Sequence, residues 1–201
     1  MASPEPLQPG QIYHIYNRGN NRENLFVEER NYRYFLTLYS RHVAPVVDTY
    51  AYCLLRNHFH LLVRIRDSTD SKANQRLPVR RPSQAFSNLF NAYAKAFNRA
   101  YGRTGALFQR PFGRIRVQSD AHFAVLVAYI HRNPVHHGFV KDLEDWPFSS
   151  YHAILSDHPT AVARESVLDW FEGQEGFRAA HQVAVEERAI APLVIEDCDL
   201  D

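Results

Sequence analysis

Apolar and polar positions alternate along four short segments of this chain, and alternation of this kind predicts β-strands. The predicted strands are residues 11–16, 46–55, 58–66 and 112–117. Three longer segments carry apolar residues every three or four positions, which is typical of amphipathic helices. The predicted helices are residues 28–42, 83–101 and 120–133, with Ser83 and Asp120 as the capping residues. Pro134 is expected to stop or kink the last of them.

In chain order these elements run strand, helix, strand, strand, helix, strand, followed by one more helix. This is the order of the ferredoxin-like split βαββαβ arrangement, an antiparallel sheet with helices on one face. The sequence therefore predicts an α+β fold with an additional helix after the sheet. A helical stretch near residues 166–188 and an acidic end follow. We expect one domain over residues 1–151 and an accessory acidic extension over residues 152–201.

Composition narrows the class of protein. The chain has 201 residues, 45% of them apolar, which is enough to bury a core. No apolar run reaches the roughly 18–20 residues of a membrane helix, and the first residues do not form a signal peptide. The two cysteines, Cys53 and Cys198, make no disulfide framework, as is typical of a reducing compartment. We therefore expect a cytoplasmic protein with no membrane partner.

Charge is distributed unevenly along the chain, although the total is only +1. Residues 51–133 carry fourteen Lys and Arg against three acidic residues, whereas residues 134–201 carry four against fourteen. A basic segment interleaved with aromatic residues indicates a polyanionic partner, because cations neutralise phosphates and rings stack on bases. The alternative is an ordinary solvated surface with many ion pairs.

The third predicted strand carries the most informative side chains. Because side chains alternate across a strand, Phe59 and Leu61 share a core face, while His58 and His60 share the other face with Arg64. Two imidazoles at positions i and i+2 can bind one metal ion. Such pairs also occur by chance, so the motif alone is weak.

The predicted helix 120–133 offers a third ligand and a nucleophile. Tyr129 and Asn133 are one turn apart and share a face. The amide oxygen of Asn133 would complete a set of two nitrogens and one oxygen, and Tyr129 could attack a phosphate held on the metal. A phenol is a poor nucleophile unless it is activated. Tyr129 could equally be a core aromatic residue, and helix periodicity does not decide between these roles.

Five segments match those of a known family, in the same order. They are residues 13–21 (YHIYNRGNN), 57–62 (NHFHLL), 101–109 (YGRTGALFQ), 129–135 (YIHRNPV) and 146–151 (WPFSSY). The chain thereby resembles the Y1-type HUH transposases, the IS200/IS605-like group, and most closely their REP-associated tyrosine transposase branch. The resemblance covers about residues 11–151.

The resemblance implies a metal-dependent nuclease and strand transferase that acts on single-stranded DNA. His58 and His60 match the two histidines of the family's metal motif, and Asn133 falls where relatives carry a third ligand. Tyr129 matches the nucleophile, which forms a 5′-phosphotyrosine link and frees a 3′-hydroxyl. The implied cofactor is a divalent metal, Mg²⁺ or Mn²⁺, and imidazole ligation favours Mn²⁺. The implied partner is single-stranded or hairpin DNA from repeated palindromes. Some relatives are homodimers and others are monomers.

Eight basic residues are candidate DNA contacts, expected at phosphates rather than at bases. They are Arg18, Arg64, Lys95, Arg99, Arg103, Arg110, Arg114 and Arg116. For each of them the alternative is a solvated surface residue. His131 and His136 are likewise expected at the surface or on DNA.

Two other functions stay open at this stage. A non-catalytic, domesticated relative could bind and regulate hairpin DNA without cutting it, although the complete set of four site residues argues against this. An RNA-binding ferredoxin-like module would present aromatic residues on its sheet, whereas this sheet presents His and Arg. The acidic extension could cover the basic groove in the absence of DNA. Deletion of residues 189–201 would then tighten binding at low salt.

Overall fold

A computed structural model describes residues 6–67 and 81–182 of the chain. Within these residues, four strands form one antiparallel sheet. They are β1 (Ile12–Arg18), β2 (Val47–Leu54), β3 (His58–Ile65) and β4 (Gly113–Arg116). Their order across the sheet is β2-β3-β1-β4, so β3 lies between β2 and β1. The predicted α+β class is confirmed.

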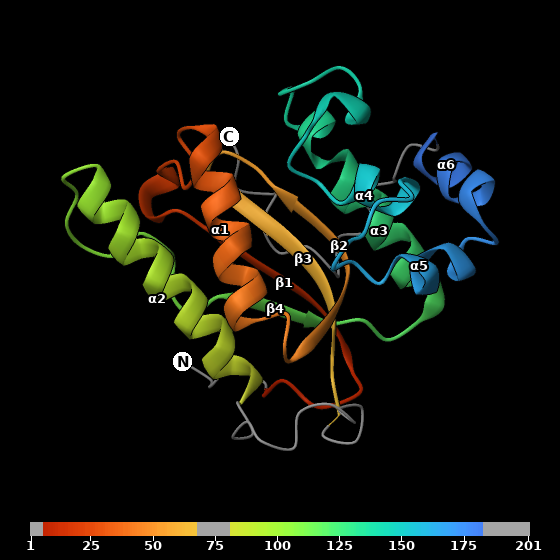
Figure 1. Ribbon diagram of the computed structural model, residues 1–201, viewed down its shortest axis with the longest axis horizontal. Helices are drawn as coiled ribbons and strands as arrows, with labels where there is room; N and C mark the ends of the chain where they lie inside the picture. Colours follow the sequence, from red (N-terminus) through yellow and green to blue (C-terminus); the bar gives the residue numbers. More distant parts are fainter. Residues whose placement is uncertain (1–5, 68–80, 183–201) are drawn as a thin grey trace.

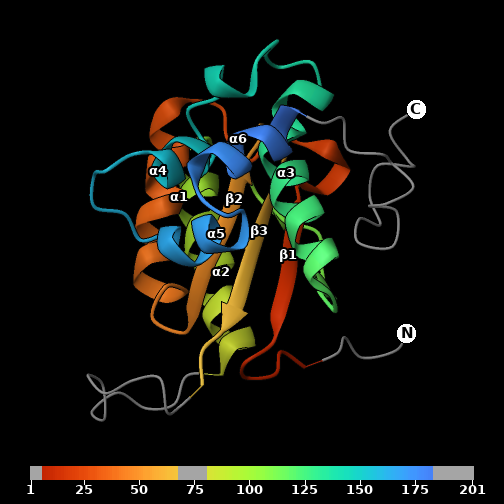
Figure 2. The same cartoon turned by 90° about the vertical axis from the view of Figure 1, so that its right-hand side faces the viewer.

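Six α-helices and two short 3₁₀ turns join and cover the strands of the described part. They are η1 (Asn20–Arg22), α1 (Glu29–His42), α2 (Pro82–Ala100), α3 (Asp120–His136), η2 (Leu143–Asp145), α4 (Tyr151–Leu155), α5 (Arg164–Trp170) and α6 (Gln174–Gln182). Helices α1 and α2 lie on one side of the sheet and α3 to α6 on the other (Figures 1 and 2). The sheet is therefore the middle of three layers.

The face under α1 and α2 is packed with aromatic side chains. The ring of Phe59 on β3 lies 5.2 Å from that of Phe35 on α1 and 5.6 Å from that of Phe90 on α2. Tyr93 is buried in the same layer, and its hydroxyl donates to the carbonyl of Leu25 at 2.6 Å. The interpretation of Tyr93 as a core residue is confirmed.

The opposite face of the sheet is also covered, because α3 needs a surface on which to bury its apolar stripe. Phe123 of α3 packs edge-on against Tyr50 of β2, with ring centroids 5.2 Å apart. Its other side stacks on Trp170 of α5 at 4.0 Å. The two helices that follow β1 and β3, α1 and α2, share one face as predicted, and the additional helix α3, whose face the sequence did not predict, covers the other. The strand face that carries His58 and His60 is consequently buried rather than solvated.

Two ends of predicted helices differ from expectation. Helix α3 passes through Pro134 and ends at His136. Proline in the last turn removes one helical hydrogen bond, but the amide of His137 still donates to the carbonyl of Asn133 at 3.0 Å. Ser119, not Asp120, caps this helix, with its hydroxyl accepting from the amide of His122 at 3.2 Å.

Two further differences concern the start of α2, where a proline lies, and the break between α5 and α6, where the backbone is left-handed. Helix α2 begins with Pro82 at its first position, so Arg81 rather than Ser83 is the N-cap residue. The single helix predicted near 166–188 is two helices, α5 and α6. They are separated where Glu172 and Gly173 adopt positive φ angles of 58° and 106°. The predictions for residues 183–201, including the acidic end, lie outside the described residues.

The segment after residue 151 packs on the sheet and on α3. The amide of Ala163 donates to the carbonyl of Thr49 at 2.8 Å, and His181 of α6 contacts His131 of α3. The domain boundary at residue 151 stays a prediction. In the described part of the chain, no helix combines the length and apolar character that a membrane span needs.

Candidate functional site

Four predicted site residues meet where α3 crosses β3. The rings of His58 and His60 are 5.1 Å apart, and the ring of Tyr129 lies 5.6 Å from that of His60. The Oδ1 atom of Asn133 lies 3.2 Å from Nε2 of His58. All four side chains are at most 4% exposed. His58 and His60 are two residues apart on a strand, and Tyr129 and Asn133 are four residues apart on a helix. The structure brings these two predicted pairs together.

Hydrogen bonds orient both imidazoles with the same nitrogen toward this meeting point. Nδ1 of His58 lies 2.8 Å from Oδ1 of Asn57, which as an amide oxygen can only accept. His58 therefore carries its proton on Nδ1 and a lone pair on Nε2 when it is neutral. Nδ1 of His60 lies 2.9 Å from Nε2 of His14. With His60 as the donor, its Nε2 atom also carries a lone pair.

Two buried atoms where these four side chains meet have no hydrogen-bond partner. Nε2 of His60 and Nδ2 of Asn133 are buried and make no hydrogen bond. In addition, Nε2 of His58 and Oδ1 of Asn133 face each other as two acceptors. A cation here would satisfy the lone pairs of the two Nε2 atoms and of Oδ1, because an unpartnered buried polar atom is costly. Nδ2 of Asn133 is a donor, and a metal ion does not supply its partner.

The donor set therefore fits a divalent metal. Two imidazole nitrogens with one amide oxygen suit Mn²⁺ better than Mg²⁺, which prefers oxygen ligands. Across residues 6–67 and 81–182, no cluster of three or more His, Cys, Asp or Glu side chains is arranged to hold a metal ion. The fit rests on His58, His60 and Asn133 together.

Burial keeps the site in the state that a metal requires. Desolvation, and secondarily the neighbouring imidazoles of His58 and His14, hold the pKa of His60 well below its usual value. His60 is therefore neutral near pH 7 and keeps its lone pair. Arg18 lies opposite His58 in the strand register and is 8% exposed, and its Nε atom makes no hydrogen bond. It is the predicted basic residue that contributes positive charge beside the site.

The other predicted DNA contacts are not at this site. Arg64 lies toward the far end of β3, where its guanidinium bonds Asp48 at 2.8 and 3.1 Å. The remaining six belong to α2, to β4 and to the segment between them. Lys95 and Arg99 are exposed on α2. Arg103 is paired with Glu23.

The last three basic residues line the sheet edge on the α2 side. Nη2 of Arg110 lies 3.5 Å from Oδ1 of Asn91. The guanidinium of Arg114 lies 4.0 Å from the centroid of the Phe112 ring. Arg116 donates to Oε1 of Gln11 at 2.5 Å. The predicted DNA contacts therefore divide between the two faces.

Sequence reasoning missed the histidines around the site. His14 bonds His60, and the ring of His137 lies 5.0 Å from that of His58. Alternation along β1 does place His14 on the face opposite Tyr13. Only the pairing of β1 with β3 shows that this is the His60 face. The prediction of His131 as a surface or DNA contact is wrong, because it is fully buried and bonded to Ser150 and His181.

The chain is similar to known proteins in sequence and in fold. No protein-family model matches the chain. A protein of Haemophilus influenzae that carries the name REP-associated tyrosine transposase is 32% identical over 107 residues, covering 52% of this chain and 59% of that protein. The REP-associated tyrosine transposase of Escherichia coli is 28% identical over 102 residues, covering 51% of this chain and 53% of that one. The chain thus spans less than two thirds of the length of these curated relatives.

A solved structure shares the fold. It is a REP-associated tyrosine transposase bound to a REP hairpin, and it superposes with a TM-score of 0.58 at 19% identity. The match covers 79% of this chain and 88% of that one. The resemblance to REP-associated tyrosine transposases is therefore confirmed in sequence and in fold.

Proposed function

We propose that this chain is a metal-dependent single-stranded DNA endonuclease and strand transferase that acts on hairpin-forming repeats through Tyr129. The observation that carries the proposal is the meeting of Tyr129 with His58, His60 and Asn133, where Nε2 of His60 is buried without a hydrogen-bond partner. The named relatives, and a solved neighbour bound to a REP hairpin, support the class of substrate. The strand order β2-β3-β1-β4 is also the order of a ferredoxin-like sheet.

The residues divide the chemistry among themselves. His58, His60 and Asn133 would hold a divalent metal, which when bound polarises the scissile phosphate and offsets its charge. Oη of Tyr129 attacks the phosphorus, and the bond from phosphorus to the 3′-oxygen breaks. The 5′-phosphate stays on Tyr129. The phenol loses one proton and the released 3′-hydroxyl gains one, so the step balances.

Arg18 has a supporting role in this proposal. Its buried guanidinium, beside His58 and with Nε unpartnered, is positioned to neutralise a second charge on the phosphate. Strand transfer is the reverse step, in which a different 3′-hydroxyl attacks the phosphotyrosine and frees Tyr129.

One observation favours a second function. Tyr129 is only 4% exposed, so little of its side chain is open to a phosphate in this structure. A non-catalytic relative that binds and regulates hairpin DNA would have no need for such access. The two functions differ in whether a covalent product forms.

The test is a search for that product. The full chain is incubated with Mn²⁺ or Mg²⁺ and 3′-labelled hairpin oligonucleotides with single-stranded flanks, drawn from repeated palindromes of the source genome. We expect a labelled protein–DNA adduct on a denaturing gel, lost with EDTA and absent from Tyr129→Phe. Tyr34→Phe, a change at an exposed tyrosine of α1, is the matched control and keeps the adduct. An adduct that persists in Tyr129→Phe would refute the nucleophile, and binding without any adduct would support the regulatory function.

A further inference from the structure

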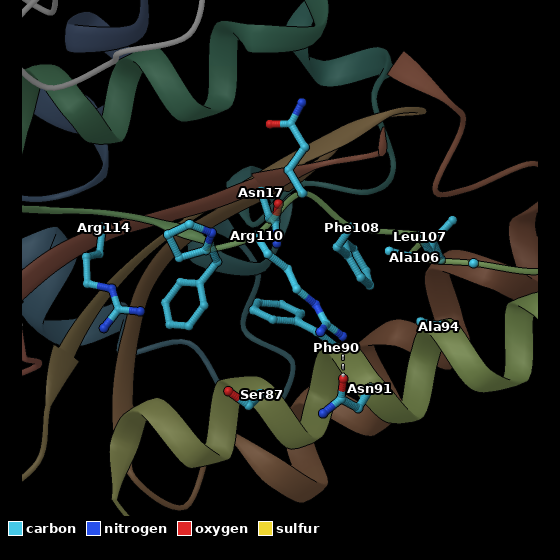
Figure 3. A pocket seen from close by; sticks show the side chains of 14 residues that line it. Asn17, Ser87, Phe90, Asn91, Ala94, Ala106, Leu107, Phe108, Arg110 and Arg114 are labelled. Carbon is cyan, nitrogen blue, oxygen red and sulfur yellow. Dashed lines mark hydrogen bonds between the residues drawn. The ribbon is translucent and has the colours of Figure 1, made fainter. Parts of the chain in front are cut away.

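A pocket of about 540 Å³ lies between α2 and residues 105–112, on the side of the sheet that α1 and α2 cover (Figure 3). Its volume is within the range of small-ligand sites, about 300–1,000 Å³. Asn17 from β1 closes one end of it. The pocket shares no lining residue with the site around Tyr129.

One wall of the pocket is aromatic and firmly supported. The ring of Phe90 lies 5.2 Å from that of Phe108 and 5.4 Å from that of Phe112. Behind them, Phe59 packs on Phe90 at 5.6 Å and Phe86 packs on Phe112 at 5.5 Å. Such a wall can hold a flat ring without first paying to order its own side chains.

The lining also includes polar and positively charged side chains. Arg110 reaches across the pocket from the 105–112 segment toward Asn91 on α2, at a donor–acceptor distance of 3.5 Å (Figure 3). That contact is weak, so a ligand can displace the guanidinium at little cost. Arg114 is the second cation of the lining, and none of the described residues that line the pocket is Asp or Glu. Lys95 is exposed on the same helix as Asn91, one turn further on.

A flat aromatic wall beside the weakly held guanidinium of Arg110 matches one chemistry, that of a nucleotide. We propose that the pocket binds one unpaired nucleotide of a DNA strand, with its base against Phe108 and Phe112 and its phosphate on Arg110. Stacking of bases on aromatic rings beside a basic groove is the general mode of single-strand binding. A base within a duplex is already stacked and paired, and so it cannot enter.

This inference rests on the proposed function in one respect, since it takes DNA to be the substrate. It adds a contact on the face opposite Tyr129, so a bound strand would pass around the edge of the sheet formed by β4. Catalysis and single-strand recognition would then occupy opposite faces.

The direct test is photo-crosslinking of the full chain. The probe is a 15-residue oligothymidylate with 5-iododeoxyuridine at its centre, irradiated without metal and digested with trypsin. We expect the crosslink in the peptide Thr104–Arg114, which contains both Phe108 and Phe112, because trypsin does not cut between Arg110 and Pro111. A crosslink confined to other peptides would overturn the proposal.

Affinity measurements supply the second test. Asn91→Trp narrows the mouth from an exposed helix position, and Arg110→Gln removes a cation. Each is expected to weaken oligothymidylate binding about 10-fold, the size of one lost stacking or phosphate contact. Binding to a blunt duplex should change less than about twofold. Arg41→Gln, a matched charge loss on exposed α1 outside the pocket, should leave both affinities unchanged. Equal losses for duplex and single strand, or no loss, would contradict the pocket.

The outcomes separate this proposal from the proposed function. A crosslink in Thr104–Arg114 without a Tyr129 adduct supports the pocket and refutes the nuclease. A Tyr129 adduct together with crosslinks confined to other peptides supports the nuclease and refutes the pocket. Binding of free thymidine monophosphate as tight as that of the oligonucleotide would overturn the assignment to a strand.

Discussion

The two faces of the sheet bury different kinds of side chain. Under α1 and α2 the buried residues are mainly aromatic, with Phe35, Phe59 and Tyr93 at the centre. Under α3 they include His60 and Asn133, with almost no exposed area. The hydrophobic effect that favours apolar burial is non-directional, whereas each buried polar group needs a hydrogen-bond partner at a set distance. The polar face is thus the one whose geometry is most tightly constrained.

A second polar network secures α3 from its outer side. His181 donates from Nδ1 to the carbonyl of Phe177 at 2.7 Å and accepts at Nε2 from Nδ1 of His131 at 2.8 Å. His131 then accepts at Nε2 from the hydroxyl of Ser150 at 2.7 Å. This chain of hydrogen bonds joins α6 and the start of α4 to α3. It therefore holds the helix that carries Tyr129 and Asn133.

The largest predicted effect is acid sensitivity confined to the α3 face. Burial lowers the pKa of His181 to about 4, against 6.5 in the unfolded chain. The neutral form is favoured in the fold, so its stabilisation is present above pH 6.5 and is lost as the pH falls toward 4. The loss in free energy of unfolding is about 3 kcal/mol, at 1.36 kcal/mol per pKa unit. His131, whose pKa is also lowered by burial, acts in the same direction.

Urea unfolding of His181→Gln at several pH values checks this prediction. The variant should be less stable than the parent at pH 7, and the gap should shrink toward pH 4. His158→Gln, at an exposed loop position, is the control and should leave the slope with pH unchanged. A parent protein equally stable at pH 4.5 and pH 7 would contradict the contrast between the faces.

The next effect concerns the orientation of the metal ligands. His14→Phe keeps a ring of similar size but removes the hydrogen bond to Nδ1 of His60. Loss of such a partner is expected to weaken Mn²⁺ binding about 10- to 100-fold. Titration calorimetry or Mn²⁺ electron paramagnetic resonance measures this directly. His158→Phe, at an exposed loop position, should bind Mn²⁺ as the parent does. Unchanged Mn²⁺ affinity in His14→Phe would mean that His60 needs no support from β1.

The smallest effect separates two arginines that sequence reasoning treated alike. Arg64 is already paired with Asp48, whereas the described residues that line the pocket beside Arg110 include no Asp or Glu. Arg110→Gln should lower the slope of log affinity against log salt by about one for the oligonucleotide. Arg64→Gln should leave that slope unchanged. Fluorescence anisotropy over a salt series distinguishes them, and equal changes would show that both faces contact phosphates alike.

Local pattern was sufficient to predict most of the elements. The strand 58–66 and the helix 28–42 agree with β3 and α1 to within one residue at each end. The predicted end of the last helix differs from the observed end for a local reason. Pro134 does not end α3, because the last turn tolerates a missing amide donor.

The candidate site could be predicted in its parts but not in its assembly. The spacing of His58 and His60 and that of Tyr129 and Asn133 each follow from one element. His14 could not be assigned, because its role depends on the register of β1 against β3. His131 was misplaced because periodicity does not show that α6 covers that side of α3.

By itself, the sequence determined the order of the helices and strands and which residues share a face of each one. It also determined the concentration of positive charge in residues 51–133. These depend on neighbours along the chain and on the fixed periods of helices and strands. Only the tertiary structure decided that α3 covers the histidine face, and that Arg18 lies beside the metal ligands while Arg110 and Arg114 line a pocket on the other face. Those relations join residues far apart in sequence, and they arise because each apolar surface must be buried against another.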